Sequence, residues 1–168
     1  MKFDEAKKQF IQTWGTLGSE WGINRTMAQI HALLLIAPEP VTTDEIMEEL
    51  QISRGNANMN LRDLLGWNLI RKELIPADRK EYFVAEKDIW EVARRITIER
   101  KKREIEPVKQ VLSRLKVVEG DPKKAEIKEF TSMMSNLESF VGKMDKATDV
   151  MIKAEQTWFF GTLLKLMK

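Results

Sequence analysis

The chain lacks cysteine and has a single histidine, His31, among its 168 residues. Without cysteine it can form no disulfide, no ordinary iron–sulfur cluster and no zinc site of the usual cysteine-rich kinds. One imidazole also excludes catalysis or metal binding that needs several. The sequence shows no Gly-rich phosphate loop and no serine in a nucleophile elbow. We therefore expect a protein that is not an enzyme and uses no cofactor or metal.

Long apolar runs are missing too. No stretch approaches the roughly 20 apolar residues that span a bilayer, and the first five residues do not begin a secretory signal. We expect a cytoplasmic protein with no membrane partner. The net charge is only +2, so a nucleic-acid-binding function would require positive charge concentrated in one region.

Helical periodicity dominates the first 40 residues. Apolar residues recur at three- and four-residue steps over residues 4–21, which predicts an amphipathic helix that is weakened near Gly15 and ended by Gly22. A second helix is predicted over residues 25–37, with Asn24 as its N-cap and Pro38 after its end. His31 falls inside this apolar helix, where we expect a hydrogen-bonded core or interface histidine rather than a switch.

The next segment predicts two short helices and a hairpin. Thr42 and Glu45 have the spacing of a capping box, so a helix should begin there. Ser53 is a natural N-cap for a further helix over residues 54–66. The period then changes from helical to two, which predicts strands over residues 69–75 and 81–86 around a turn. The order is that of a helix-turn-helix followed by a wing.

The helix over residues 54–66 has the character of a recognition helix. In a helix-turn-helix the second helix enters the major groove, so its outer face needs small and hydrogen-bonding side chains. Asn56, Asn58 and Asn60 can each offer a donor and an acceptor to adenine, and Arg62 can reach guanine or phosphate. Gly55 lets backbone amides approach a phosphate. The alternative is a solvated helix whose asparagines have no role.

The hairpin would extend this surface. Arg79 at its tip could lie against phosphates or in the minor groove, although a charged turn is a common alternative. The acidic helix before the recognition helix should point away from phosphate, and the basic run over residues 94–103 is more typical of a solvated helix face. The predicted DNA contacts are Thr42, Ser53, Arg54, Gly55, Asn56, Asn58, Met59, Arg62, Arg71, Arg79 and Lys80.

The C-terminal half is helical in pattern. Residues 88–118 are amphipathic, with Pro107 as an expected kink or break, and Asp121 and Pro122 should cap and begin the next helix. Apolar residues then form a heptad seam. Its members are Ile127, Phe130, Met134, Leu137, Val141 and Met144. This seam and the aromatic end of the chain predict a homodimer. Whether residues 122–168 form one helix or bend near residues 145–149 stays open.

These residues resemble the GbsR-type branch of the MarR family of transcriptional regulators. The resemblance rests on residues 27–34, 42–46, 53–62 and 79–83 and covers about 60 residues closely. It implies a homodimer held by its N- and C-terminal helices and two winged domains that bind a pseudo-palindromic operator. Repression would be the commoner outcome. For some members it also implies a response to choline or related quaternary ammonium compounds.

We thus predict a mainly α fold with a small β-hairpin wing (α+β). Residues 1–22 would form a dimerisation helix, residues 23–87 the winged helix-turn-helix and residues 88–168 a helical dimerisation and effector region. An effector, choline-like or a lipophilic cation, could bind an aromatic pocket. Its predicted lining is Trp14, Trp21, Trp158, Phe159 and Phe160, which could equally be dimer core. The alternative function is a winged-helix module that binds protein, since fold alone does not decide.

Overall fold

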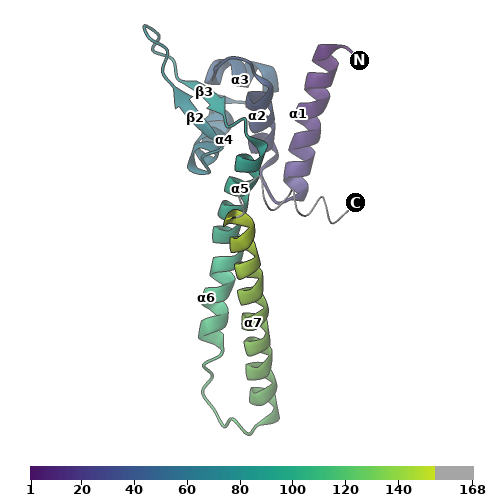
Figure 1. Ribbon diagram of the computed structural model, residues 1–168, viewed down its shortest axis with the longest axis vertical. Helices are drawn as coiled ribbons and strands as arrows, with labels where there is room; N and C mark the ends of the chain where they lie inside the picture. Colours follow the sequence, from purple (N-terminus) through teal and green to yellow (C-terminus); the bar gives the residue numbers. More distant parts are fainter. Residues whose placement is uncertain (154–168) are drawn as a thin grey trace. The chain divides into compact units, whose positions relative to one another are not determined.

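In the computed structural model, which describes residues 1–153, the chain divides into two compact units, Met1–Arg95 and Ile96–Lys168. The first unit holds four helices and a small sheet (Figure 1). Its elements are α1 (Phe3–Glu20), α2 (Arg25–Ile36), β1 (Val41–Thr42), α3 (Thr43–Leu50), α4 (Arg54–Gly66), β2 (Ile70–Glu73) and β3 (Tyr82–Ala85). α5 (Ile89–Arg100) begins in this unit. No helix within residues 1–153 is long and apolar enough to cross a membrane.

The glycines of α1 support packing instead of breaking the helix. α1 runs without interruption through Gly15 and Gly18, and both residues are buried. A Cβ on Gly15 would lie 2.6 Å from Cγ of Gln29, and one on Gly18 would lie 2.6 Å from Cβ of Ala28. The missing side chains let α1 approach α2 closely. The helix ends at Glu20, and Gly22, expected to end it, follows the C-cap Trp21 with a φ of +74° that suits glycine.

Local signals set the starts of the next three helices. The side chain of Asn24 accepts from the Met27 amide, and Thr42 and Glu45 form the predicted capping box. Ser53 accepts from the Asn56 amide at the start of α4. Each cap satisfies a backbone donor that has no partner within its helix. The predicted positions of α2, α3 and α4 are therefore confirmed.

The sheet has three antiparallel strands in the order β1-β3-β2. β2 and β3 form the predicted hairpin, with Ile70 opposite Ala85 and Glu73 opposite Tyr82. β1, in which Val41 pairs with Phe83, was not predicted from the sequence. β1 ties the start of α3 to the wing, so the helix-turn-helix and the hairpin share one core. The most deeply buried residues of that core are Ile30, Leu34, Ile46, Leu61, Leu64 and Asn60.

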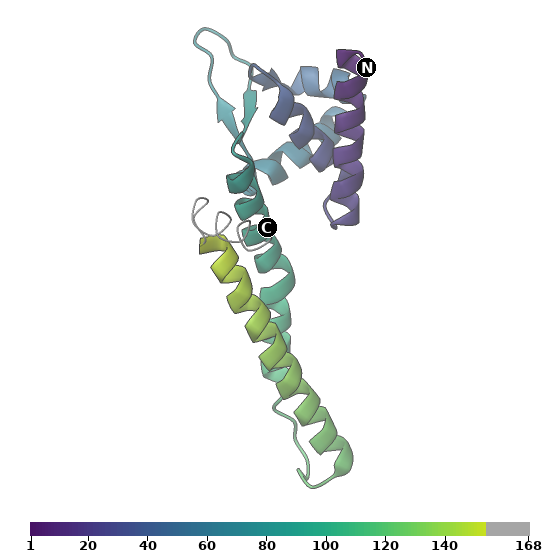
Figure 2. The same ribbon diagram turned by 45° about the vertical axis from the view of Figure 1, so that its right-hand side comes forward.

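The described part of the second unit is an antiparallel helical hairpin (Figure 2). It contains the end of α5, a π-helix η1 (Lys101–Ile105), α6 (Glu106–Leu115) and α7 (Ala125–Lys153). η1 ends two residues before Pro107. The Pro107 nitrogen has no hydrogen to donate to the ordinary helical acceptor, and its ring disfavours the preceding α-helical turn. The predicted kink or break at Pro107 therefore takes the form of a wider helical turn.

α7 begins later than predicted. Asp121 caps a turn, in which its side chain accepts from the Lys123 amide and its carbonyl from the Lys124 amide. The helix itself starts at Ala125, so Pro122 is not its first residue. From there α7 is continuous to Lys153, without a bend near residues 145–149. Residues 154–168 lie outside the described part of the chain.

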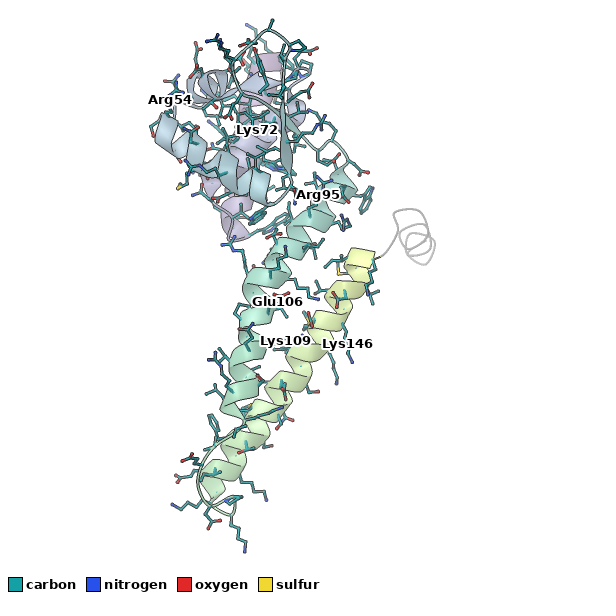
Figure 3. The ribbon with its side chains drawn as sticks, turned by 90° about the vertical axis from the view of Figure 1, so that its left-hand side faces the viewer. Arg54, Lys72, Arg95, Glu106, Lys109 and Lys146 are labelled. Carbon is teal, nitrogen blue, oxygen red and sulfur yellow. The ribbon has the colours of Figure 1, made fainter. Side chains whose placement is uncertain are left out.

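An ion-pair network joins the two arms of this hairpin. Lys109 on α6 faces α7 and pairs with the buried Asp145 (Figure 3). Nζ of Lys101 on η1 lies 2.9 Å from Oδ1 of Asp145 and also pairs with Asp149. Hydrogen bonds from Lys109 and then Lys101 lower the pKa of the Asp145 carboxyl. The π-turn brings both lysines to the same side of the arm.

Candidate nucleic-acid interface

α4 has a buried face and an outer face. Ala57, Leu61 and Leu64 are buried and hold the helix on α2 and α3. On the opposite side Gly55, Met59 and Arg62 are exposed, and Asn58 is half-buried between them. Asn56 lies half-buried at the edge of this outer face. The predicted recognition residues are therefore brought together on the side of α4 that its core contacts leave free.

Asn60 does not belong to that face. Its side chain is fully buried, and Nδ2 donates to the backbone oxygen and to Oδ1 of Asn56, both at 2.8 Å. The expectation that its amide could meet adenine was wrong. Position 60 is three residues after Ala57 and four before Leu64, so it falls on the anchored side of the helix. That spacing was the available signal, and the polar residue type concealed it.

The open space beside Gly55 is informative because the fold does not require it. A Cβ at this position would meet nothing within 4 Å. Glycine inside a helix is less stable than alanine by roughly 0.5–1 kcal/mol. Gly55 thus reduces stability without any packing benefit inside the first unit. What it provides is a flat patch of backbone in the first turn of α4, where a phosphate or a base edge could approach.

Replacing Gly55 by alanine should therefore separate stability from binding. We expect the free energy of unfolding to rise by about 0.5–1 kcal/mol, while DNA binding weakens because the added methyl group keeps the duplex away. Denaturant titration and a DNA-binding assay measure the two effects. Gly66→Ala is the matched control, because Gly66 is exposed at the other end of α4 and also has open space. Unchanged or tighter DNA binding by Gly55→Ala would contradict a close approach of the duplex to Gly55.

Most acidic side chains of α3 form ion pairs or hydrogen bonds within the first unit. Asp44 pairs with the exposed Arg54 at the start of α4, which is labelled in Figure 3. Glu45 belongs to the capping box, and hydrogen bonds from Thr42 lower its pKa. Glu49 pairs with Lys7 of α1 at 2.8 Å. Thr42 itself is buried, and its hydroxyl and amide both contact Glu45. Thr42 therefore holds α3 in place, and Arg54 can reach phosphate only by leaving Asp44.

Asp78 organises the tip of the wing. Its Oδ1 accepts from the Lys80 amide at 2.9 Å, and its Oδ2 accepts from the Tyr82 hydroxyl at 2.7 Å. These two hydrogen bonds, in that order, lower the pKa of the Asp78 carboxyl. They span Arg79 and leave that residue and Lys80 exposed at the end of the hairpin. The tip therefore presents two adjacent cations on a defined turn.

Several of the other basic residues have acidic partners within the described residues. On β2, Lys72 pairs with Glu81, and Arg71 lies 3.8 Å from Glu73. In the basic run over residues 94–103, Arg94 and Arg95 share Glu91, Arg100 pairs with Glu104, and Lys102 pairs with Glu99. These ion pairs reduce the local positive charge. Arg62 and Arg79 are the cations for which the geometry most favours a contact with DNA.

The predicted effector residues are only partly described. Trp14 is half-buried on α1, with its ring centroid 5.5 Å from that of Phe10, and Trp21 is 58% exposed. The remaining predicted lining residues, Trp158, Phe159 and Phe160, lie outside the described residues. The aromatic pocket therefore stays a prediction.

Lys87 has a structural role that was not predicted from the sequence. Its ammonium donates to the backbone oxygens of Leu34, Leu35 and Ala37 at 2.7–2.9 Å. These carbonyls lie at the end of α2, where a cation is favourable. Burial lowers the Lys87 pKa. Because the acceptors are about 50 residues away in sequence, no local pattern could have shown this contact.

Comparisons with known proteins agree with this geometry. Residues 21–81 match the model of the MarR family. The HTH-type transcriptional repressor GbsR of Bacillus subtilis is 29% identical over 87 residues, which are 52% of this chain and 48% of that protein. The chain thus spans about half the length of the curated relative that it matches.

A solved structure has the same fold. It is described as that of a transcriptional regulator, has a TM-score of 0.57 and 18% identity, and covers 86% of this chain and 98% of its own. At that identity the likeness concerns the fold alone. The first unit has a winged helix fold, and residues 21–81 of it are similar to the MarR family of regulators. The chain is also similar, at 29% identity, to the GbsR repressor.

Proposed function

We propose that this protein is a transcriptional regulator that binds double-stranded DNA in a sequence-specific manner and acts as a repressor. The observation that carries the proposal is the outer face of α4, where Gly55, Asn58, Met59 and Arg62 lie together beside a capped N-terminus. A protein-docking face would more often present aromatic anchors. The name of the similar Bacillus protein supports repression.

We further propose that two copies bind a pseudo-palindromic operator. A twofold dimer presents two recognition helices, and each would contact one half-site in the major groove. The apolar side chains exposed on α7 support association of two copies. The site residues on α4 and on the wing belong to the same unit of one chain, so each copy would supply a complete reading surface.

Selection of bound fragments from a genomic DNA pool by the purified protein tests this function. A shared inverted repeat is the expected result. Arg62→Ala should weaken operator binding at least tenfold, about 1.4 kcal/mol, and relax preference at one base pair. Arg79→Ala should weaken binding to all DNA sequences by a similar factor. It should also reduce the slope of log affinity against log salt concentration by about one unit. Arg114→Ala, on the exposed surface of α6, should change neither operator affinity nor its salt dependence. Recovery of no common sequence would overturn the proposal.

We also propose a small cationic effector, choline-like or lipophilic, that lowers operator affinity. Trp14 and Trp21 on α1 support it, because aromatic faces attract such cations. A ligand that weakens DNA binding must itself bind more weakly in the presence of DNA, by the same factor. Tryptophan fluorescence and operator binding, titrated together with choline, betaine and lipophilic cations, should change in parallel. No response in either signal at millimolar concentration would exclude this class of effector.

A further inference from the structure

The buried Asn60 sets the orientation of its own side-chain amide. Its amide group lies 2.8 Å from the backbone oxygen of Asn56. A backbone oxygen only accepts hydrogen bonds, so the Asn60 atom that faces it must be the donor Nδ2. The reversed amide would place two oxygens against each other. Asn60 therefore has one allowed orientation, and its Oδ1 has no partner among the residues that the structure describes.

This orientation determines that of Asn56 in turn. The same Nδ2 of Asn60 lies 2.8 Å from the Asn56 side-chain amide. Since the Asn60 group is a donor, the Asn56 atom that meets it must be the acceptor Oδ1. Oδ1 of Asn56 is thus directed along the helix toward position 60. Within residues 1–153 the structure gives the other end of this amide, Nδ2, no hydrogen-bond partner.

The position of Asn56 makes this constraint relevant to recognition. Asn56 is the third residue of α4 and lies half-buried at the edge of the outer face. The first residues of a recognition helix are those that contact base edges. An unrestrained asparagine binds adenine with both ends of its amide, donating to N7 and accepting from the N6 amino group. Asn56 Oδ1 uses one of its two lone pairs on Asn60 and is turned toward position 60, so Nδ2 is the end of the amide better placed to meet a base.

We propose that Asn60 is a positioning residue that makes Asn56 present its amide donor to a keto base, guanine or thymine, in each half-site. In the major groove guanine presents two acceptors, O6 and N7, and thymine presents O4, whereas cytosine presents an amino donor and adenine presents its amino donor beside a single acceptor, N7. This inference rests on the proposed DNA-binding function and adds a base preference to it. Asn58 carries no such restraint in the described structure and is free to use both ends of its amide.

The buried amide contributes little else to the fold. Asn60 lies among Ala57, Leu61 and Leu64, where an apolar side chain would also fit the pattern. An unpartnered buried oxygen is unfavourable for stability. Leucine at this position should therefore keep the fold while removing the donor that restrains Asn56. Asn60→Leu thus tests positioning separately from packing.

The experiment is a selection of DNA sites by the full-length protein, followed by binding measurements on the selected operator and its single-base variants. Asn56→Ala identifies the base pair that Asn56 contacts. At that pair we expect wild type to prefer the keto base about tenfold over the amino base. Asn60→Leu should reduce this preference to less than about threefold, and Asn56→Asp, which offers only acceptors, should reverse it. Asn58→Ala should alter the base preference at a different base pair.

The outcomes separate this inference from the proposed function. If wild type selects no common sequence, the proposed function fails, and the inference fails with it. If wild type selects an operator but has adenine at the Asn56 pair, or if Asn60→Leu keeps the full keto preference, only the inference is overturned. Asn56→Asp and Asn56→Ala change a partly exposed residue, so they give a result even if Asn60→Leu does not fold. Ratios between bases, not absolute affinities, are compared, because the carboxylate introduced by Asn56→Asp would also repel phosphate.

Discussion

Phe140→Glu should convert the protein from a dimer to a monomer and abolish tight operator binding. Light scattering should report about twice the 19.6 kDa chain mass for wild type and the single chain mass for the variant. Each substituted side chain occurs twice in a twofold dimer. At about 2 kcal/mol for each central apolar anchor, the loss is about 4 kcal/mol, roughly a thousandfold in the dimer dissociation constant.

The exposed apolar residues of α7 are the basis for this expectation. They follow alternate steps of three and four residues and are between 39% and 61% exposed. They are Phe130, Met133, Leu137, Phe140 and Met144. α6 presents Val108, Val111 and Leu115 at the same spacing, also about 43–44% exposed. An apolar stripe of this length is unfavourable in water, and its heptad spacing suits helix-to-helix packing.

Ser135→Glu is the matched control for the dimer. Ser135 lies on the same helix and is exposed, but it is outside the apolar stripe. The added charge is the same, so a loss of association specific to Phe140→Glu would locate the interface. A wild-type protein that is monomeric at micromolar concentration would contradict both the dimer and the inverted repeat. A Phe140→Glu dimer as stable as the wild-type dimer would show that the interface does not include Phe140.

The heptad seam shows what periodicity can and cannot determine. The predicted seam combined two neighbouring faces of α7. Ile127, Met134 and Val141 are half-buried, whereas Phe130, Leu137 and Met144 are 39–49% exposed in the described hairpin. A heptad pattern marks apolar positions, but it does not say whether the partner helix is in the same chain. That assignment requires the arrangement of α6 and α7 in space.

Elements with short-range causes were predicted well. The starts of α2, α3 and α4 depend on a side chain and an amide three residues apart, so the sequence contains both partners. Elements with long-range causes were missed. β1 exists because Val41 meets Phe83, and Lys87 caps a helix that ended about 50 residues earlier. In the candidate site, helical periodicity predicted the outer face of α4. The same periodicity places Asn60 on the buried face, but its polar residue type concealed this.

Lowering the pH should destabilise the protein through His31. Its side chain is 3% exposed in α2, as expected of a core histidine, and Nε2 has no hydrogen-bond partner among the described residues. Burial, and then the charge of Lys87, lowers its pKa from 6.5 to about 4. A neutral imidazole is tolerated in this core, whereas an imidazolium has neither solvent nor an acceptor to stabilise it.

The direction of this pH effect follows from how many protons the folded and unfolded chains bind. Between pH 6.5 and about 4 the unfolded chain binds a proton at His31 and the folded chain does not, so the free energy of unfolding falls as the pH falls. The stability is fully present above pH 6.5, and about 3 kcal/mol is lost once the pH reaches the folded pKa. Roughly 2 kcal/mol of this should be lost already at about pH 5. The lowered carboxyl pKa values of Glu45, Asp78 and Asp145 act at lower pH.

Urea titrations at about pH 7.5 and pH 5 measure this difference, and His31→Leu is the variant that assigns it. Because His31 is the only histidine in the chain, the loss of stability on acidification should disappear in His31→Leu. Asn60→Leu, which replaces another fully buried polar residue of the same core, should keep the loss and so controls for repacking. An equal loss in His31→Leu would show that some other group titrates. A wild type whose stability is the same at both pH values would show that His31 is protonated as easily in the folded protein as in the unfolded chain.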